Sequence, residues 1–303
     1  MRSSLLFSLC LVACMSAQAQ TIIGTTTYDV QTNNGHKHRI IAYPDGQISA
    51  LWTGSFDPIN TFTDRGMFYT HNDGVAWGVF PTERVEDVRT GFGEIVQVMD
   101  HELVVSHDNA LINIRLYENA AIGDNAWTES AGSQQILGVW PSAYCEPGTN
   151  TLYIVNMDAA LPTELRFSRS DDGGASWSVL NYTLPFLTTA DGFPSIAAAA
   201  ENYQVVAHGP DVYVLFGIPT SDLVLLHSDD YGNDGSWESN VIIDFPYDNY
   251  TGTVQSDLDG DGITDTINTA DGSHNMIITD DGTVHVFSPL YRMSVMQGPL
   301  DIF

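Results

Sequence analysis

The sequence predicts an all-β chain whose strands are grouped into repeated, blade-like units, as in a β-propeller. Two observations support this. Tryptophans that end polar, glycine-containing turns recur at intervals of 50, 50 and 60 residues, and a short strand pattern recurs in step with them. One blade cannot bury both faces of its sheet, so we expect the blades to stack around a common axis.

The tryptophan marker consists of Trp77, Trp127, Trp177 and Trp237. The strand marker alternates apolar and polar residues after a turn, which is typical of a half-buried strand. It occurs five times, at 45–52, 102–107, 151–156, 211–216 and 281–287.

The two markers keep a constant phase. From a central apolar residue of each of the first four strands, the next marker tryptophan lies 24 to 29 residues further on. No tryptophan follows the fifth strand before Phe303. We therefore expect four complete blades and a partial fifth over residues 20–303, as in a fragment of a six-bladed protein.

The charge balance restricts the partners. The chain has 10 Lys and Arg against 38 Asp and Glu, a formal charge of −28 at pH 7. Such a surface repels phosphate backbones and anionic lipid heads. We therefore expect no nucleic-acid or membrane-surface partner. No later segment approaches the eighteen or so apolar residues that a membrane helix needs, so no transmembrane segment is expected either. We also expect a monomer.

The first 19 residues resemble a signal peptide. Arg2 precedes an apolar run at 5–15, and Ala17-Gln18-Ala19 offers a cleavage site of small residues. The expectation is a secreted or cell-surface protein that begins at Gln20. Alternatively, 11–14 resembles a lipoprotein box in which Cys14 would be lipidated. After cleavage at 19 only Cys145 remains, so no intrachain disulfide is expected.

The clearest tryptophan turn runs from Ser170 to Trp177, with the pattern S-x-D-x-G-x-S-W. It resembles the Asp-box of the sialidase (BNR-repeat) superfamily, and 70–77 and 228–237 resemble weaker copies. The resemblance implies a structural turn between the third and fourth strands, on the side away from substrate. The chain also resembles secreted bacterial propellers that carry a C-terminal sorting domain.

Substrate in that superfamily meets the face where the innermost strands begin. By the phase of the repeats, we place these starts at Arg39, 89–94, 140–142, 193–195 and 274–275. The resemblance implies that Arg39 grips an anionic sugar and that Asp64, before the first turn, is the acid/base catalyst. The proline that follows this arginine in sialidases is absent.

Further substrate contacts are expected from other side chains on this face. Each also has a structural interpretation: an arginine paired for stability, Asp64 capping its own loop, or aromatic side chains belonging to the core. The expected contacts are Arg65, Arg89, Trp140, Phe193 and His274.

One loop predicts a calcium site within an insertion at about 246–272. From residue 257, carboxylates stand at positions 1, 3, 5 and 9 and glycine at position 6, a pattern that wraps oxygens around Ca²⁺. Asn268 replaces the usual acidic residue at position 12. The alternative is a solvated acidic turn. The expected ligands are Asp257, Asp259, Asp261, Ile263 and Asp265.

Two functions remain open. One is a glycoside hydrolase of sialidase type that acts on anionic sugars of extracellular glycans. The other is a non-catalytic propeller that binds an extracellular carbohydrate or glycoprotein at its mouth. The hydrolase needs a nucleophile, and no tyrosine or carboxylate in the sequence can be assigned to that role.

Overall fold

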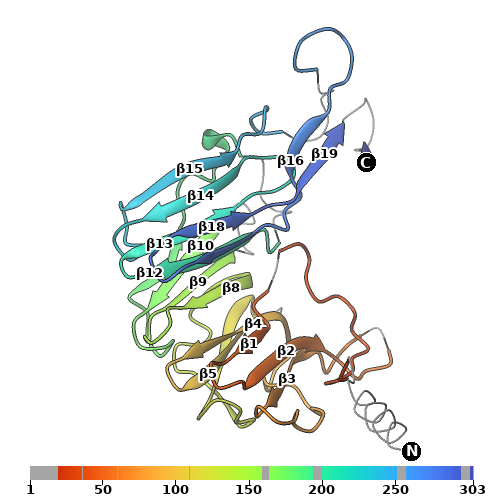
Figure 1. The fold of residues 1–303 in the computed structure, drawn as a ribbon, viewed down its shortest axis with the longest axis vertical. Helices are drawn as coiled ribbons and strands as arrows, with labels where there is room; N and C mark the ends of the chain where they lie inside the picture. The colour runs from red at the N-terminus through yellow and green to blue at the C-terminus, as the bar shows by residue number, and fades with distance from the viewer. Residues whose placement is uncertain are drawn as a thin grey trace, which may run out of the picture.

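The computed structural model describes residues 20–35, 37–59, 61–108, 110–158, 164–193, 200–250, 257–294 and 301–302. Within these residues the chain is an all-β propeller, in which antiparallel sheets follow one another along the sequence and around an axis (Figure 1). Residues 1–19, and with them Cys14, lie outside the described residues.

The first sheet has three strands in sequence order, and an isolated bridge between Asn72 and Trp77 stands where a fourth would begin. Residues 78 and 85 run beside the third strand, since their amides donate to His71 and Met67. The strands are β1 (Ile40–Ala42), β2 (Ile48–Gly54) and β3 (Gly66–Asn72).

The second, third and fourth sheets each have four antiparallel strands. The second contains β4 (Thr90–Val98), β5 (His101–Asp108), β6 (Asn113–Asn119) and β7 (Trp127–Glu129). The third contains β8 (Val139–Cys145), β9 (Leu152–Met157), β10 (Leu165–Ser170) and β11 (Val179–Thr183). The fourth contains β12 (Tyr203–His208), β13 (Asp211–Phe216), β14 (Leu223–Ser228) and β15 (Trp237–Ile243).

The C-terminal unit is less regular. A hairpin pairs β17 (Asn275–Ile278) with β18 (Val284–Phe287). A separate sheet joins β16 (Ile267–Ala270), β19 (Leu290–Ser294) and β20 (Asp301–Ile302). Figure 1 shows the segment before β16 projecting away from the blades.

The strand pattern marks the second strand of every unit, and the tryptophan marks the start of the outermost strand or lies near it. Trp127 and Trp237 begin β7 and β15, and Trp177 precedes β11 by two residues. The five predicted strands are confirmed as β2, β5, β9, β13 and β18.

Central blades are buried on both faces because each lies between two neighbours. Side chains along a strand point alternately to opposite faces. In β5, Leu103 and Val105 pack with Ile154 of the third sheet, whereas Val104 packs with Leu51 of the first. This explains why middle strands are apolar on both faces.

The innermost strands begin as predicted in four of the five units, at β1, β4, β8 and β17. The predicted start of the fourth unit at Phe193 is wrong. A 3-10 turn, η1 (Thr189–Asp191), precedes Phe193, and β12 begins only at Tyr203. The phase of the repeats placed this start too early, because the spacing between units is not constant along the chain.

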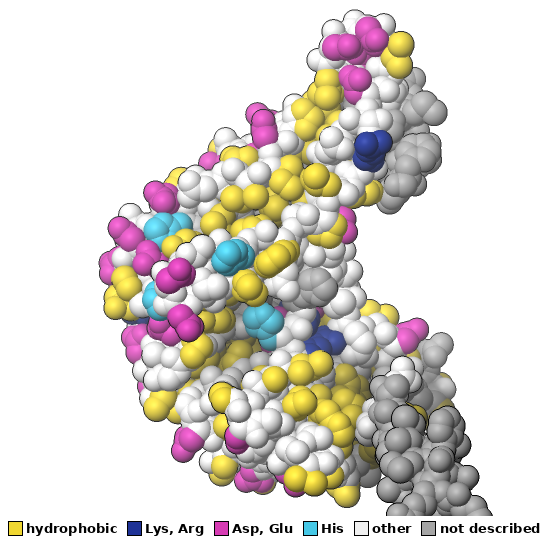
Figure 2. All heavy atoms as spheres, in the orientation of Figure 1, with side chains coloured by type: hydrophobic (Ala, Val, Ile, Leu, Met, Phe, Trp, Pro, Cys, Tyr) yellow, Lys and Arg dark blue, Asp and Glu magenta, His cyan; other side chains and the backbone are white. Residues whose placement is uncertain are grey.

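The described blades form an open arc. Figure 1 shows the first sheet at one end and β16 and β19 at the other, and Figure 2 shows the hollow between these two ends. In the described part of the chain, no helix is long and apolar enough to cross a membrane.

Candidate functional site: the mouth of the propeller and a cavity beside the first sheet

Lys37 occupies the mouth at the axis of the arc. Its ammonium lies 3.7 Å from Glu94 of β4 and 3.4 Å from Glu201, just before β12, and it donates to the carbonyl of Pro141 in β8. The three charged side chains are at most 3% exposed. One side chain therefore links the second, third and fourth blades. The sequence analysis missed this cluster, although Lys37 is the only lysine in the chain.

Residues 31–35, which precede β1, extend across the mouth to Glu201 and Asn202. The Thr32 hydroxyl donates to Glu201 (2.9 Å), and the Asn34 amide donates to Asn202 (3.0 Å). Gln31 is tied to the first sheet through the carbonyl of Thr53 (2.8 Å). Residues 31–35 thus connect the first and fourth blades.

Two inner strands carry a bulge at the mouth. The register shifts between Gly91 and Glu94 in β4 and between Val139 and Ser142 in β8. Phe92 and Trp140 lie in these bulges with φ of 54° and 53°, an uncommon conformation for bulky side chains. Bulges of this kind redirect side chains.

The bulges help to form a row of rings along the mouth. Phe92 stacks on His107 at 5.6 Å, and His107 meets Trp140 edge-on at 6.0 Å. At the other end, Tyr28 contacts both Phe62 (5.0 Å) and Phe92 (6.3 Å). Phe92 and His107 are buried, whereas Tyr28, Phe62 and Trp140 are half-buried.

Arg39 directly precedes β1, the innermost strand of the first sheet, close to the predicted start, and its guanidinium is engaged by uncharged groups. It donates to the side-chain oxygen of Gln31 (3.0 Å), to the carbonyl of Gln31 and to the carbonyl of Gly93 (3.2 Å). Burial lowers its pKa, against the attraction of Glu201 and Glu94. In this conformation Arg39 orders the segment before β1.

Arg65 and Arg89 lie on the same face. Arg65 is buried, donates to the carbonyl of Thr90 (2.8 Å), and lies over the rings of Tyr28 and Phe92. Burial and then the charge of Arg89 lower the pKa of Arg65. Arg89 donates to the carbonyl of Phe62 (2.9 Å).

Asp64 accepts hydrogen bonds from its own loop. Burial opposes its ionisation, but the Ser55 hydroxyl and the amides of Phe56 (2.7 Å) and Asp57 (3.3 Å) outweigh burial, so its pKa is lowered. Asp64 is therefore an ionised acceptor that orders the β2–β3 loop, and it is poorly suited to donate a proton.

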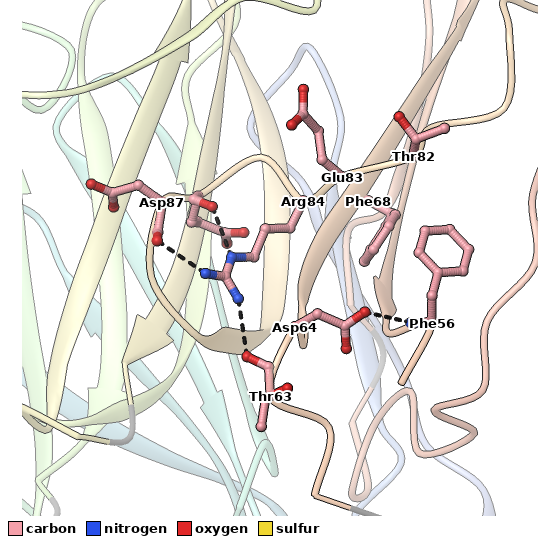
Figure 3. A pocket seen from close by; sticks show the side chains of 9 residues that line it. Phe56, Thr63, Asp64, Phe68, Thr82, Glu83, Arg84 and Asp87 are labelled. Atoms are coloured by element: carbon pink, nitrogen blue, oxygen red, sulfur yellow. Dashed lines mark hydrogen bonds between the residues drawn. The ribbon is translucent and has the colours of Figure 1, made fainter. Parts of the chain in front are cut away.

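A cavity of about 480 Å³ opens beside Asp64, between the first sheet and the segment that follows it. Figure 3 shows the rings of Phe56 and Phe68 together along one part of its wall and Arg84 along another. The two rings meet edge-on at 5.0 Å, and Phe56 is 42% exposed. The sequence analysis found Asp64 but missed these neighbours, because residues 82–87 carry no motif.

The other two predicted contacts are buried. Phe193 is 3% exposed and packs in the core against Phe216 at 5.6 Å. His274 is 1% exposed, and its Nε2 donates to the carbonyl of Asn202 (3.0 Å). Among the described residues its Nδ1 has no hydrogen-bond partner, and burial lowers its pKa to about 4.

The predicted calcium loop brings three of its carboxylates together. Oxygen atoms of Asp257, Asp259 and Asp265 lie within 4.8 Å of one another. Asp257 also accepts the amides of Gly260 (2.7 Å) and Gly262 (3.0 Å), so the loop curls around its own carboxylate. Carboxylate oxygens at this spacing suit a hard cation such as Ca²⁺. Asp261 instead accepts the amide of Ile263 (2.7 Å).

Comparisons with known proteins show no family by sequence: no family model matches the chain, and no curated protein matches it. Solved structures do match. One is an Aleuria aurantia lectin mutant in complex with alpha-methyl-L-fucoside, with a TM-score of 0.46 and 14% identity over 87% of this chain and 75% of that chain.

Two further matches are glycoside hydrolases. An alpha-L-arabinofuranosidase from Clostridium thermocellum matches with a TM-score of 0.45 and 11% identity, over 84% of this chain and 93% of that chain. The NanB sialidase from Streptococcus pneumoniae matches with a TM-score of 0.48 and 9% identity, over 95% of this chain and 65% of that chain. All three scores lie below 0.5, so these likenesses transfer no function to this chain.

Proposed function

We propose that the protein is a secreted, non-catalytic propeller that binds saccharides, with the cavity beside Asp64 as its binding site. One observation carries the proposal: the exposed ring of Phe56 lies beside a fixed carboxylate in a cavity of about 480 Å³. Sugar rings present C–H faces that pack on aromatic side chains, and their hydroxyls donate to carboxylates.

The chemistry of Asp64 favours binding over hydrolysis. A glycosidase needs one carboxyl group with a raised pKa to protonate the leaving group and a second carboxylate on the other side of the bond. Asp64 has the opposite shift. Glu86 also lines the cavity and burial raises its pKa, but it is 2% exposed and bonded to Met67 and Ser106. Glu86 therefore joins two blades and is not available to a substrate.

The side chains at the mouth support a sialidase less well than the cavity supports saccharide binding. Arg39 uses its guanidinium on Gln31 and Gly93, whereas a carboxylate clamp needs two N–H groups directed at the ligand. The half-buried rings of Tyr28 and Trp140 fit an extension of a saccharide surface along this face.

The test measures binding of neutral oligosaccharides of glucose, mannose and N-acetylglucosamine to the full chain by calorimetry. Phe56→Ala should weaken binding about five- to ten-fold, the size of one aromatic contact. Phe287→Ala is the matched control, because Phe287 is exposed on β18, far along the chain from the cavity. Equal effects of the two variants, or no binding at millimolar sugar, would refute the proposal.

Hydrolysis is tested separately with fluorogenic glycosides that include a sialoside. We expect no turnover. Turnover that disappears in Asp64→Asn would instead assign the acid/base role to Asp64 and favour the hydrolase.

A further inference from the structure

We infer that the saccharide bound beside Asp64 carries a free, positively charged amino group. The inference rests on the proposed saccharide function and concerns the same cavity. Among the described residues, those that line this cavity include four with carboxyl side chains, and Arg84 is the only basic one. The question is which of these charges a ligand would meet.

Arg84 does not direct its charge at a ligand. Its guanidinium donates to the carbonyls of Glu86 and Asp87, both at 2.9 Å, and to those of Thr63 and Arg65, both at 3.4 Å. Figure 3 shows the bonds to Thr63 and Asp87 holding the guanidinium against the chain. A donor set occupied by main-chain oxygens is a poor partner for an anionic sugar.

The carboxyl groups differ in exposure. Glu86 is buried and bonded to Met67 and Ser106, so it serves the blades. Asp87 accepts the hydroxyl of Tyr117 but is exposed. Asp64 is half-buried and Glu83 is exposed, and Figure 3 shows their side chains on different sides of the space beside the two phenylalanine rings. These two, together with Asp87, present the negative charge that a ligand would meet.

This combination suits an ammonium group. Cations are attracted to aromatic faces and to carboxylates. The formal charge of −28 on the whole chain also attracts cations. A uronic or sialic acid would meet repulsion from the same groups. An amino sugar satisfies the ring, through its C–H face, and the carboxylates, through its ammonium.

The test compares two hexasaccharides of one geometry, β-1,4-glucosamine and its N-acetylated form, by calorimetry at low and high salt. The amine form should bind several-fold tighter at low salt, and the difference should shrink at 1 M salt, where charges are screened within about 3 Å. Glu83→Gln should weaken the amine form about two- to five-fold and leave the acetylated form unchanged.

Two controls separate the cavity from general attraction to an acidic protein. Asp229→Asn removes the same charge from an exposed turn between β14 and β15 and should leave both affinities unchanged. Phe56→Ala should weaken both sugars. Equal effects of Glu83→Gln and Asp229→Asn would overturn the inference.

The remaining outcomes are distinguishable. Equal or tighter binding of the acetylated hexamer, lost in Phe56→Ala, overturns the inference and leaves the saccharide function in place. Binding of neither hexamer overturns both. If a tetralysine peptide binds with the same dependence on Phe56 and Glu83 and the sugars do not, the cavity recognises basic peptides, and the inference is wrong.

Discussion

Lys37 and Glu201 form a buried ion pair at the mouth of the propeller, with Nζ 3.4 Å from Oε1 and side chains that are 3% and 0% exposed. Lys37 belongs to the segment before the first blade, and Glu201 immediately precedes the fourth. Glu94 of the second blade completes the cluster. The contact therefore fixes parts of the arc that are distant in sequence.

Replacing Lys37 by methionine should reduce the free energy of unfolding by about 3–5 kcal/mol. The substitution leaves two buried carboxylates without their cation. It also removes the desolvation cost of burying the Lys37 ammonium, but this gain in stability is smaller than the loss. Urea denaturation of the full chain measures the change. Arg292→Met removes one exposed charge from β19 and should cost less than about 0.5 kcal/mol.

A double-mutant cycle with Glu201→Gln identifies the pair as the cause. The double variant should be less destabilised than the sum of the single variants. Additive effects, or a Lys37→Met variant within 1 kcal/mol of the parent, would show that the cluster does not hold the blades.

The repeat could be predicted from sequence because its markers are local. Trp177 and Leu152 lie within one blade, and each such pair is set by turn and strand chemistry that recurs in the next blade. The mouth could not be predicted in the same way. Lys37, Glu94 and Glu201 come from three separate segments, and only packing of the blades brings them together.

The candidate site residues show the same contrast between local sequence signals and contacts that depend on the folded chain. Asp64 and Arg39 were singled out by the resemblance to the sialidase superfamily, Asp64 by its place before the first tryptophan turn and Arg39 by its place at the start of an inner strand. Their hydrogen bonds to loop amides and main-chain carbonyls depend on loop conformation, which leaves no pattern in the sequence. Phe193 was misplaced because the phase of the repeats was carried into the fourth unit, where β12 starts ten residues later.

His274 should make stability depend on pH between about 4 and 6.5. Its folded pKa is lowered to about 4, whereas the unfolded side chain titrates near 6.5. In this window the unfolded chain binds the extra proton, so stability falls as pH falls. The full loss is about 3 kcal/mol, since one pKa unit corresponds to about 1.4 kcal/mol.

Urea denaturation at pH 7 and pH 4.5 should show a smaller loss for His274→Gln than for the parent. The exposed His285 on β18 provides the control, and His285→Gln should keep the parent's pH dependence. The same slope in all three proteins would mean that His274 is not buried as a neutral imidazole.

The turn at 170–177 should depend on one aspartate. Asp172 accepts the Ser170 hydroxyl and the Ser176 amide, both at 2.8 Å, and also the Ser176 hydroxyl. Asp172→Ala should lower the free energy of unfolding by about 1–2 kcal/mol, because the Asp172 carboxylate is a charged acceptor for several hydrogen-bond donors of the turn. Asp229→Ala, at the neighbouring position of a sister turn, should cost little.

Lowering the pH should reduce the difference in the free energy of unfolding between Asp172→Ala and the parent. Although burial opposes ionisation of Asp172, the bonds from Ser176 and Ser170 lower its pKa. Its contribution is present above the unfolded pKa and is lost as pH falls through the folded pKa. A difference that is constant down to pH 2 would indicate a packing effect instead.

Calcium should stabilise the acidic loop before β16. Asp257, Asp259 and Asp265 offer a converging set of hard oxygen ligands, and a cation that binds only the folded loop stabilises it by mass action, by about 2.7 kcal/mol at 100 times the dissociation constant. Thermal unfolding with excess EGTA, Ca²⁺ or Mg²⁺ measures this.

We expect the melting temperature to rise with Ca²⁺ and less with Mg²⁺, which requires stricter octahedral geometry. Asp259→Asn should remove the response, and Asp229→Asn should retain it. If Ca²⁺ shifts no transition, or if the shift survives in Asp259→Asn, these carboxylates form only a solvated turn.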